Sequence, residues 1–217
     1  MKNIQRRKQD GMFRFAFSST TGIYPRRFEN IKTGKSGYAP ACKNEWVRNI
    51  CQKPKIKCHG CQHRQFISVT DEQIQWHLQG MDDQRKAFVM GIYPMMLDDT
   101  CYFLAVDFDK ENWDVDAKAF LATCHQMNLP AVLERSRSGN GGHVWLFFSE
   151  AVPAILARKL GAYILTETMD RHPQLGLDSY DRFFPNQDTL PKGGFGDNYP
   201  DRGGWAEKGI LGEAVKS

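Results

Sequence analysis

The sequence predicts an α+β fold, in which a four-stranded sheet with two crossover helices follows a small cysteine-rich module. Three observations support this. From residue 101 onward, stretches of strand length and of helical periodicity occur in the order strand, helix, strand, strand, helix, strand. Upstream, four cysteines lie within twenty residues. The first 70 residues carry 15 Lys/Arg against 3 Asp/Glu, a net +12, whereas the remainder carries 14 against 22, a net −8. A basic front and an acidic body fit a nucleic-acid-facing module beside a metal-binding one; a solvated basic tail is the alternative.

Length and composition allow one medium domain with an appendage, or two small domains. The chain has 217 residues, 41% hydrophobic and 25% charged. No apolar run approaches the roughly 20 residues of a membrane span, and the N-terminus lacks the apolar core of a signal peptide. We therefore expect a cytoplasmic protein without a membrane partner, in which the cysteines are thiols or metal ligands.

The N-terminal region mixes cations with aromatic residues and glycines. A short helix is expected around Phe13–Phe17. Residues 24–38 suit a nucleic-acid backbone with stacked bases, although a polar hairpin has the same composition. The candidate nucleic-acid-binding residues are Arg26, Arg27, Lys32 and Lys35.

The cysteines are spaced C-x8-C-x6-C-x2-C. Cys58-His59-Gly60-Cys61 has the form of half a structural zinc site, and two further cysteines could complete it. His59 and His63 are alternative ligands, and free thiols in a loop are the other interpretation. Neighbouring lysines should lower the thiol pKa values and favour thiolates. The predicted zinc ligands are Cys42, Cys51, Cys58 and Cys61.

Residues 71–80 predict a helix, with Thr70 as its N-cap and Gly80 as its C-cap. His77 on this helix is interpreted as a packed residue rather than a ligand. Residues 88–97 predict a strand and turn beside the strand that follows, with methionines filling the core.

The strand at residues 101–109 ends in two acids. Alternate residues of a strand share a face, so Asp107 and Asp109 should lie together while Phe108 enters the core. Two close carboxylates repel unless a cation separates them, and oxygen ligands suit Mg²⁺ or Mn²⁺. The alternative is a pair of solvated turn acids.

The remaining elements are a helix at 115–127, a strand at 131–134, a strand at 143–148, a helix at 152–169 and a strand at 175–181. This order matches the split β-α-β arrangement of an RRM-like sheet. In that topology Asp107, Asp109, His143 and Asp181 could converge on one surface. Cys101 and Cys124 fall on apolar faces and should be core residues.

A glycine-rich turn precedes His143. It offers backbone N–H groups, hydroxyls and guanidiniums, which suit a phosphate chain. A histidine beside a strand can also be merely structural, and Arg137 can be a solvated cation. The candidate phosphate-binding residues, besides His143, are Arg135, Arg137, Ser138, Asn140 and Lys192.

These residues carry a resemblance to a known family. The Asp107-Phe108-Asp109 strand end, the turn into His143 and the segment 179–188 resemble the three motifs of archaeo-eukaryotic primases and primase-polymerases. The surrounding sequence is similar to the branch found in TOTE conflict systems and CRISPR-associated primase-polymerases, from about Tyr24 to Gly196. The resemblance implies a nucleotidyltransferase that extends a primer from (d)NTPs on a single-stranded DNA or RNA template by a two-metal mechanism.

The resemblance also implies roles for single residues. His143 would bind the incoming triphosphate, and Asp181 would be the third metal-binding acid, with Asp178 and Asp188 as rivals. The superfamily writes the histidine motif as Ser-x-His, whereas this chain has Gly141 at the serine position. Ser138 or a backbone N–H could replace the hydroxyl.

The sequence divides into a basic region at 1–70 with its zinc module at 42–61, a catalytic domain at 71–196 and a polar tail at 197–217. The tail departs from the apolar segment that the family would place there, which suggests a truncated or shortened element. Two alternatives follow: a catalytically degenerate nucleic-acid-binding domain, and a metal-dependent nuclease that uses the same acids. A helicase or nuclease of the same system is an expected partner.

Overall fold

The computed structural model describes residues 22–31, 33–136 and 139–190. They divide into two compact units: the first contains the described residues up to Leu97 together with Leu190, and the second spans Asp98–Thr189. The division at residue 70 that the sequence predicts stays a prediction. Several predictions concern residues outside the described ranges, namely the helix around Phe13–Phe17, the sites at Lys32, Arg137, Ser138 and Lys192, and the tail at 197–217.

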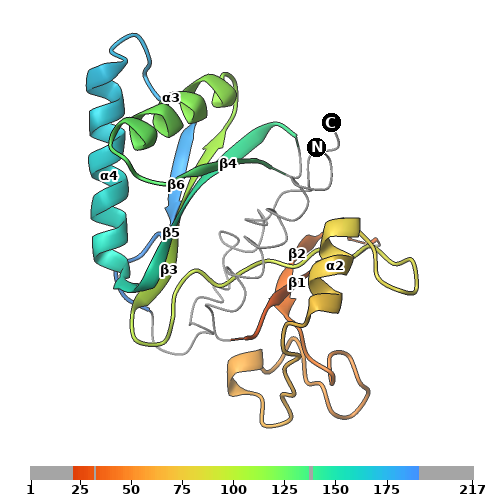
Figure 1. Cartoon of the computed structure of the whole chain (residues 1–217). Helices are drawn as coiled ribbons and strands as arrows, with labels where there is room; N and C mark the ends of the chain where they lie inside the picture. The colour runs from red at the N-terminus through yellow and green to blue at the C-terminus, as the bar shows by residue number, and fades with distance from the viewer. Residues whose placement is uncertain (1–21, 32, 137–138, 191–217) are drawn as a thin grey trace. The chain divides into compact units, whose positions relative to one another are not determined.

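The first unit is built from a hairpin, a cysteine-containing loop and one helix (Figure 1). Strands β1 (Pro25–Glu29) and β2 (Ser36–Pro40) pair antiparallel. The loop contains the 3-10 helix η1 (Cys58–Gly60) and is tied back by a bridge between Cys42 and Phe66. Helix α2 (Asp71–Gln79) follows it. The core of this unit is small and aromatic, and includes the buried side chains Tyr24, Tyr38, Ile74, Phe88 and Met90.

Both predicted caps of helix α2 are confirmed. Thr70 and Gln73 form a capping box, which satisfies backbone N–H groups that the first turn leaves unpaired. Gly80 ends the helix in the left-handed region at φ 75°, a conformation that costs glycine little. His77 is packed as predicted, with 5% of its surface exposed, and its Nδ1 accepts the Met90 N–H at 3.2 Å.

Burial of His77 predicts a pH-dependent stability. Burial lowers its pKa from 6.5 to about 4, so between these values the unfolded chain binds more protons than the folded one. The stabilisation from neutral His77 is complete above pH 6.5 and is lost as the pH falls toward 4. We expect the free energy of unfolding to drop between pH 7 and pH 5 by up to about 2 kcal/mol more in the wild type than in His77→Gln. Urea unfolding at both pH values measures this difference; equal drops would contradict it.

The strand predicted at residues 88–97 is wrong. Only isolated bridges occur there, such as that between Met90 and Arg26. The strand at 101–109 pairs instead with two later segments of the chain. The apolar run is buried by the first unit's own core rather than by sheet pairing, and Met90 and Met95 are core residues as predicted.

The second unit is a four-stranded sheet with two helices (Figure 1). Its elements are β3 (Thr100–Asp109), α3 (Trp113–Gln126), β4 (Val132–Arg135), β5 (Gly141–Pro153), α4 (Ala154–Arg171) and β6 (Tyr180–Phe184). The strand order is β4-β5-β3-β6, and each neighbouring pair is antiparallel. The predicted mixture of helices and strands is confirmed, with boundaries shifted by a few residues.

Both helices pack on one face of this sheet. The core there contains Val106 and Phe108 of β3, Val144 of β5, Phe120 of α3 and Ile164 of α4. Phe108 therefore enters the core as predicted, and Cys101 and Cys124 are both fully buried. Since side chains alternate along a strand, Asp107 and His143, which are direct partners across β3 and β5, project from the opposite face.

Candidate active site

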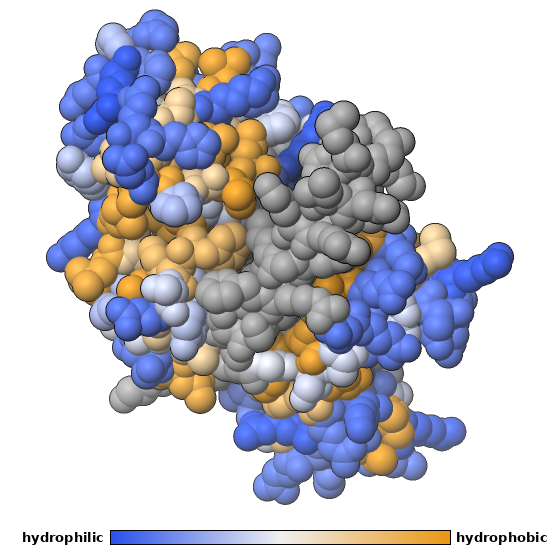
Figure 2. Space-filling view, in the orientation of Figure 1, coloured by the Kyte–Doolittle hydropathy of each residue, from blue (hydrophilic) through white to orange (hydrophobic). Residues whose placement is uncertain are grey.

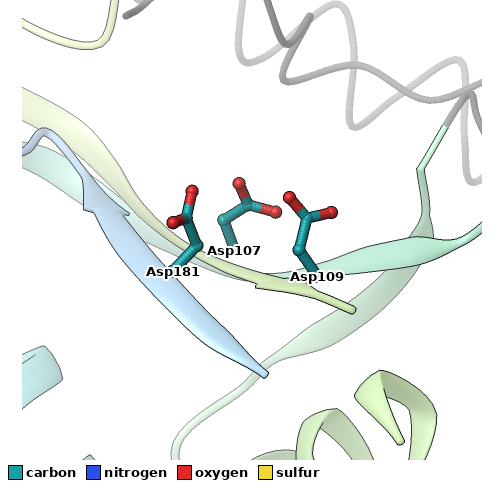
Figure 3. A group of neighbouring side chains, drawn as sticks. All are labelled: Asp107, Asp109 and Asp181. Carbon is teal, nitrogen blue, oxygen red and sulfur yellow. The ribbon is translucent and has the colours of Figure 1, made fainter. Parts of the chain in front are cut away.

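Three carboxylates gather at the ends of two neighbouring strands (Figure 3). Asp107, Asp109 and Asp181 each offer an oxygen, and these oxygens all lie within 4.8 Å of one another. Asp107 is only 1% exposed, and the other two are half-buried. Hard carboxylate oxygens at this spacing fit a small divalent cation such as Mg²⁺ or Mn²⁺, which would also relieve their repulsion. The group could therefore hold a metal ion.

An irregularity in β6 explains how Asp181 joins the other two acids. The register pairs Asp107 with Arg182 but Phe108 with Tyr180, so Asp181 is an extra residue of β6 between these two cross-strand pairs. A bulge of this kind re-aims a side chain and is common beside active sites. Tyr180 and Phe183 still pack against the core, while Asp181 lies beside Asp107 (Figure 3).

His143 lies between two acids. Its Nε2 is 3.4 Å from Asp107 Oδ1, and its Nδ1 is 3.5 Å from Glu134 Oε2. Burial lowers the pKa of His143, but the hydrogen bond that its imidazole donates to Glu134 and the charges of Glu134, Asp107 and Asp109 outweigh burial, so the pKa lies above its ordinary value. A cation among the carboxylates would oppose this rise.

Glu134 is a site residue that sequence reasoning missed. It is the cross-strand partner of His143 on β4, and its Oε2 also accepts the Trp145 Nε1–H at 2.8 Å. The same Oε2 atom therefore contacts both the Trp145 indole and the His143 imidazole. Only the strand register reveals this pairing, because Glu134 alone reads as an ordinary strand-end acid.

Close packing explains the glycine at the motif serine position. A Cβ at Gly141 would meet Asp109 Oδ1 at 2.6 Å and the Phe108 carbonyl oxygen at 2.8 Å. The same Cβ would be 3.2 Å from Ser136 Oγ. The Ser136 hydroxyl thus lies close to the motif position, and the Ser136 backbone N–H donates to the Gly141 carbonyl at 2.9 Å; Ser138 lies outside the described residues.

The other described candidates for phosphate binding lie in the turn before His143. Arg135 Nε and Nη2 both donate to the Gly139 carbonyl, at 2.9 and 2.7 Å, so this guanidinium closes the turn. Asn140 is exposed beside it. Of the rivals to Asp181, Asp188 pairs with Arg158 and Asp178 is exposed, and neither belongs to the acidic group.

The four predicted zinc ligands line one small cavity in the first unit. Cys42, Cys51, Cys58 and Cys61 share it with His63. Over the described ranges 22–31, 33–136 and 139–190, Asp107, Asp109 and Asp181 form the one group of three or more potential ligands whose atoms all lie within 4.8 Å of one another. The cysteine sulfurs therefore do not meet this distance criterion as a group of three. The expectation that lysines lower the thiol pKa values is wrong for Cys58, because burial raises its pKa more than Lys53 lowers it.

Two of the predicted nucleic-acid-binding arginines are engaged within the first unit. Arg26 stacks over the Phe88 ring at 4.9 Å and lies 3.4 Å from Asp82, and Arg27 pairs with Glu29. Lys35 is exposed near the end of the hairpin.

The antiparallel sheet with clustered carboxylates and a histidine near its strand ends places the second unit in the class of mixed helix-and-strand proteins whose site could hold a divalent metal ion. The chain belongs to a specific family within this class: the model of the TOTE conflict system archaeo-eukaryotic primase domain matches residues 10–199. A comparison with curated proteins gave no match. Membership supports a primase/polymerase-type nucleotidyltransferase, with nucleic acid and nucleoside triphosphates as general substrates. Among the helices that the structure describes, none combines the length and apolarity of a membrane crossing.

Proposed function

We propose that this chain is a DNA primase/polymerase domain that joins (d)NTPs to a primer end on a single-stranded template. The observation that carries the proposal is the convergence of Asp107, Asp109 and Asp181 beside His143. The strand order β4-β5-β3-β6, with α3 and α4 on one face, supports the interpretation of this unit as an RRM-like split β-α-β sheet. Family membership supports the reaction class.

In this proposal the residues have distinct roles. Asp107, Asp109 and Asp181 would hold Mg²⁺ or Mn²⁺ ions, which neutralise charge on the attacking and leaving oxygens in phosphoryl transfer. His143 would bind the incoming triphosphate, and Glu134 would orient its ring. Ser136 would contribute the hydroxyl close to the motif position, with a backbone N–H of the glycine-rich turn as the alternative. Asn140, Arg137, Ser138 and Lys192 are further phosphate candidates.

The first unit would grip the template. Its segment 42–66 carries six Lys/Arg against one Glu, a net +5, which favours a phosphate backbone. Lys35 on the hairpin would add to this positive charge, with Lys32, Arg26 and Arg27 nearby in sequence. A helicase or nuclease of the same conflict system would act beside this domain.

Primer extension separates this proposal from its two alternatives. The full chain is incubated with Mn²⁺, labelled dNTPs or NTPs and a primed template whose next base is varied. We expect incorporation of the complementary nucleotide alone. Binding without incorporation would favour a degenerate nucleic-acid-binding domain, and shortening of the DNA without added triphosphates would favour a nuclease; either result overturns the proposal.

We also propose a structural zinc ion in the cavity that Cys42, Cys51, Cys58 and Cys61 line. A loop with so small a core gains its folding energy from such an ion. Purified protein should hold one zinc per chain, and chelation should lower the unfolding temperature of this unit by more than about 10 °C. Elemental analysis should show zinc loss in Cys58→Ser and retention in His59→Ala and His63→Ala. Zinc loss in a histidine variant would assign that histidine as a ligand instead.

A further inference from the structure

The cysteine-containing loop, residues 42–66, presents one large aromatic side chain to solvent. Trp46 is 69% exposed, whereas Tyr24, Tyr38, Phe88 and Tyr93 of the same unit are buried. The other exposed large hydrophobic residues of the loop are Val47 and Ile56, each 39% exposed, and the space-filling view colours most of the visible loop hydrophilic (Figure 2). A large aromatic side chain usually stabilises a fold through its burial, and the Trp46 side chain is mostly exposed. Packing within the fold therefore does not explain the tryptophan at this position.

The backbone at Trp46 is also in an unfavourable conformation. Its φ is 60°, in the left-handed region that glycine and asparagine favour and that bulky residues rarely adopt. Such residues persist where the surroundings impose them and are concentrated at binding sites. Here the Glu45 N–H donates to the Cys42 carbonyl and the Val47 N–H to the Asn44 carbonyl, both at 3.2 Å, so the turn that carries the indole is hydrogen-bonded on both sides.

A cation lies over the ring. Lys53 Nζ lies 5.6 Å from the centre of the Trp46 ring and donates to Glu45 Oε1 at 2.7 Å. The loop that carries the ring also has five exposed cations against its single acid, Glu45. These cations are Lys43, Arg48, Lys55, Lys57 and Arg64.

We propose that Trp46 is a stacking platform for a base of single-stranded DNA or RNA, with the cations of the loop along the phosphate backbone. Single-strand-binding grooves combine exposed aromatic rings with positively charged side chains, because every nucleotide has both a base that can stack and a phosphate. The loop's net charge of +5 favours a negatively charged occupant. A nucleic acid fits better than an acidic protein segment, because it provides aromatic base faces as well as negative charge. Duplex bases are already stacked, so the site discriminates against duplex DNA. This inference rests on the proposed function only in naming the template as the ligand.

Fluorescence anisotropy of labelled oligothymidine tests the inference on the full chain without metal or triphosphates. Trp46→Ala should weaken binding by about 5-fold to 100-fold, and Trp46→Phe should restore most of the affinity. On an abasic oligonucleotide of the same length, wild type and Trp46→Ala should bind equally, because only phosphates remain. Ile56→Ala, which truncates another exposed apolar residue of the same loop, should change affinity less than about 2-fold.

Binding of oligothymidine by Trp46→Ala within about 2-fold of the wild type would overturn the inference, as would an equal loss on the abasic oligonucleotide. Preferential binding of duplex DNA by the wild type would also overturn it. The assay involves no catalysis, so a protein that fails in primer extension can still show the expected stacking. Conversely, if the protein extends primers but its affinity for oligothymidine does not depend on Trp46, the proposed function stands and the stacking site at Trp46 is refuted.

Discussion

Replacing Asp107 and Asp109 together with asparagine is expected to reduce nucleotide incorporation by on the order of 10³-fold or more. Asparagine preserves the shape of each buried side chain but removes the charge that would bind the cations. Metal ions supply several kcal/mol of transition-state stabilisation, and about 1.4 kcal/mol corresponds to tenfold in rate. Incorporation at saturating Mn²⁺ and dNTP, measured per folded protein, provides the comparison.

Asp178→Asn is the matched control for this experiment. Asp178 is an exposed acid three residues from Asp181, outside the acidic group. We expect it to retain incorporation within about 2-fold of the wild type, as for a surface substitution away from the site. Near-normal incorporation by the Asp107→Asn/Asp109→Asn protein would contradict the assignment of these two acids as metal ligands. Loss of incorporation in Asp178→Asn would indicate that Asp178 belongs to the site.

Restoring the superfamily serine by Gly141→Ser should impair the enzyme by at least about 10-fold. The added Cβ would approach Asp109 Oδ1 to 2.6 Å and the Phe108 carbonyl oxygen to 2.8 Å. One of these neighbours is backbone, so the strand or the carboxylate must shift, and a misplacement of about 1 Å at a reacting centre can cost on the order of 10²-fold. The incorporation rate and Mn²⁺ affinity should fall together.

Gly60→Ser is the control for this glycine substitution, because nothing lies within 4 Å of a Cβ added there. It should retain the wild-type incorporation rate. Ser136→Ala should in turn raise the KM for nucleotides more than it lowers kcat, since its hydroxyl is assigned to triphosphate binding. Wild-type or higher activity in Gly141→Ser would show that this side of Asp109 accommodates a hydroxymethyl group and would contradict the close packing.

The sequence was most informative where side chains follow a simple period. Alternation along residues 101–109 predicted that Phe108 enters the core and that the acids share the other face, and the structure has Phe108 fully buried. Capping residues fixed both ends of helix α2. The apolar run at 88–97 misled because periodicity does not distinguish a strand from a buried irregular segment.

Features of the site that depend on register could not be predicted. The extra residue at Asp181 places its carboxylate beside Asp107, and nothing local in Tyr180–Phe184 indicates a bulge. Glu134 becomes a neighbour of His143 only through the pairing of β4 with β5. The Ser136 hydroxyl lies beside the motif position, where a Cβ on residue 141 would come within 3.2 Å of it. Each of these contacts joins segments whose relative alignment a single sequence does not determine.

The central claim is that Asp107, Asp109 and Asp181 form one divalent-cation site. Titration of the full chain with Mn²⁺, followed by the loss of the free-ion EPR signal, tests it most directly. The account predicts saturable binding in the wild type and Asp178→Asn, and loss of that binding when all three acids are changed to asparagine in a protein that remains folded. Undiminished Mn²⁺ binding by the triple variant would contradict it.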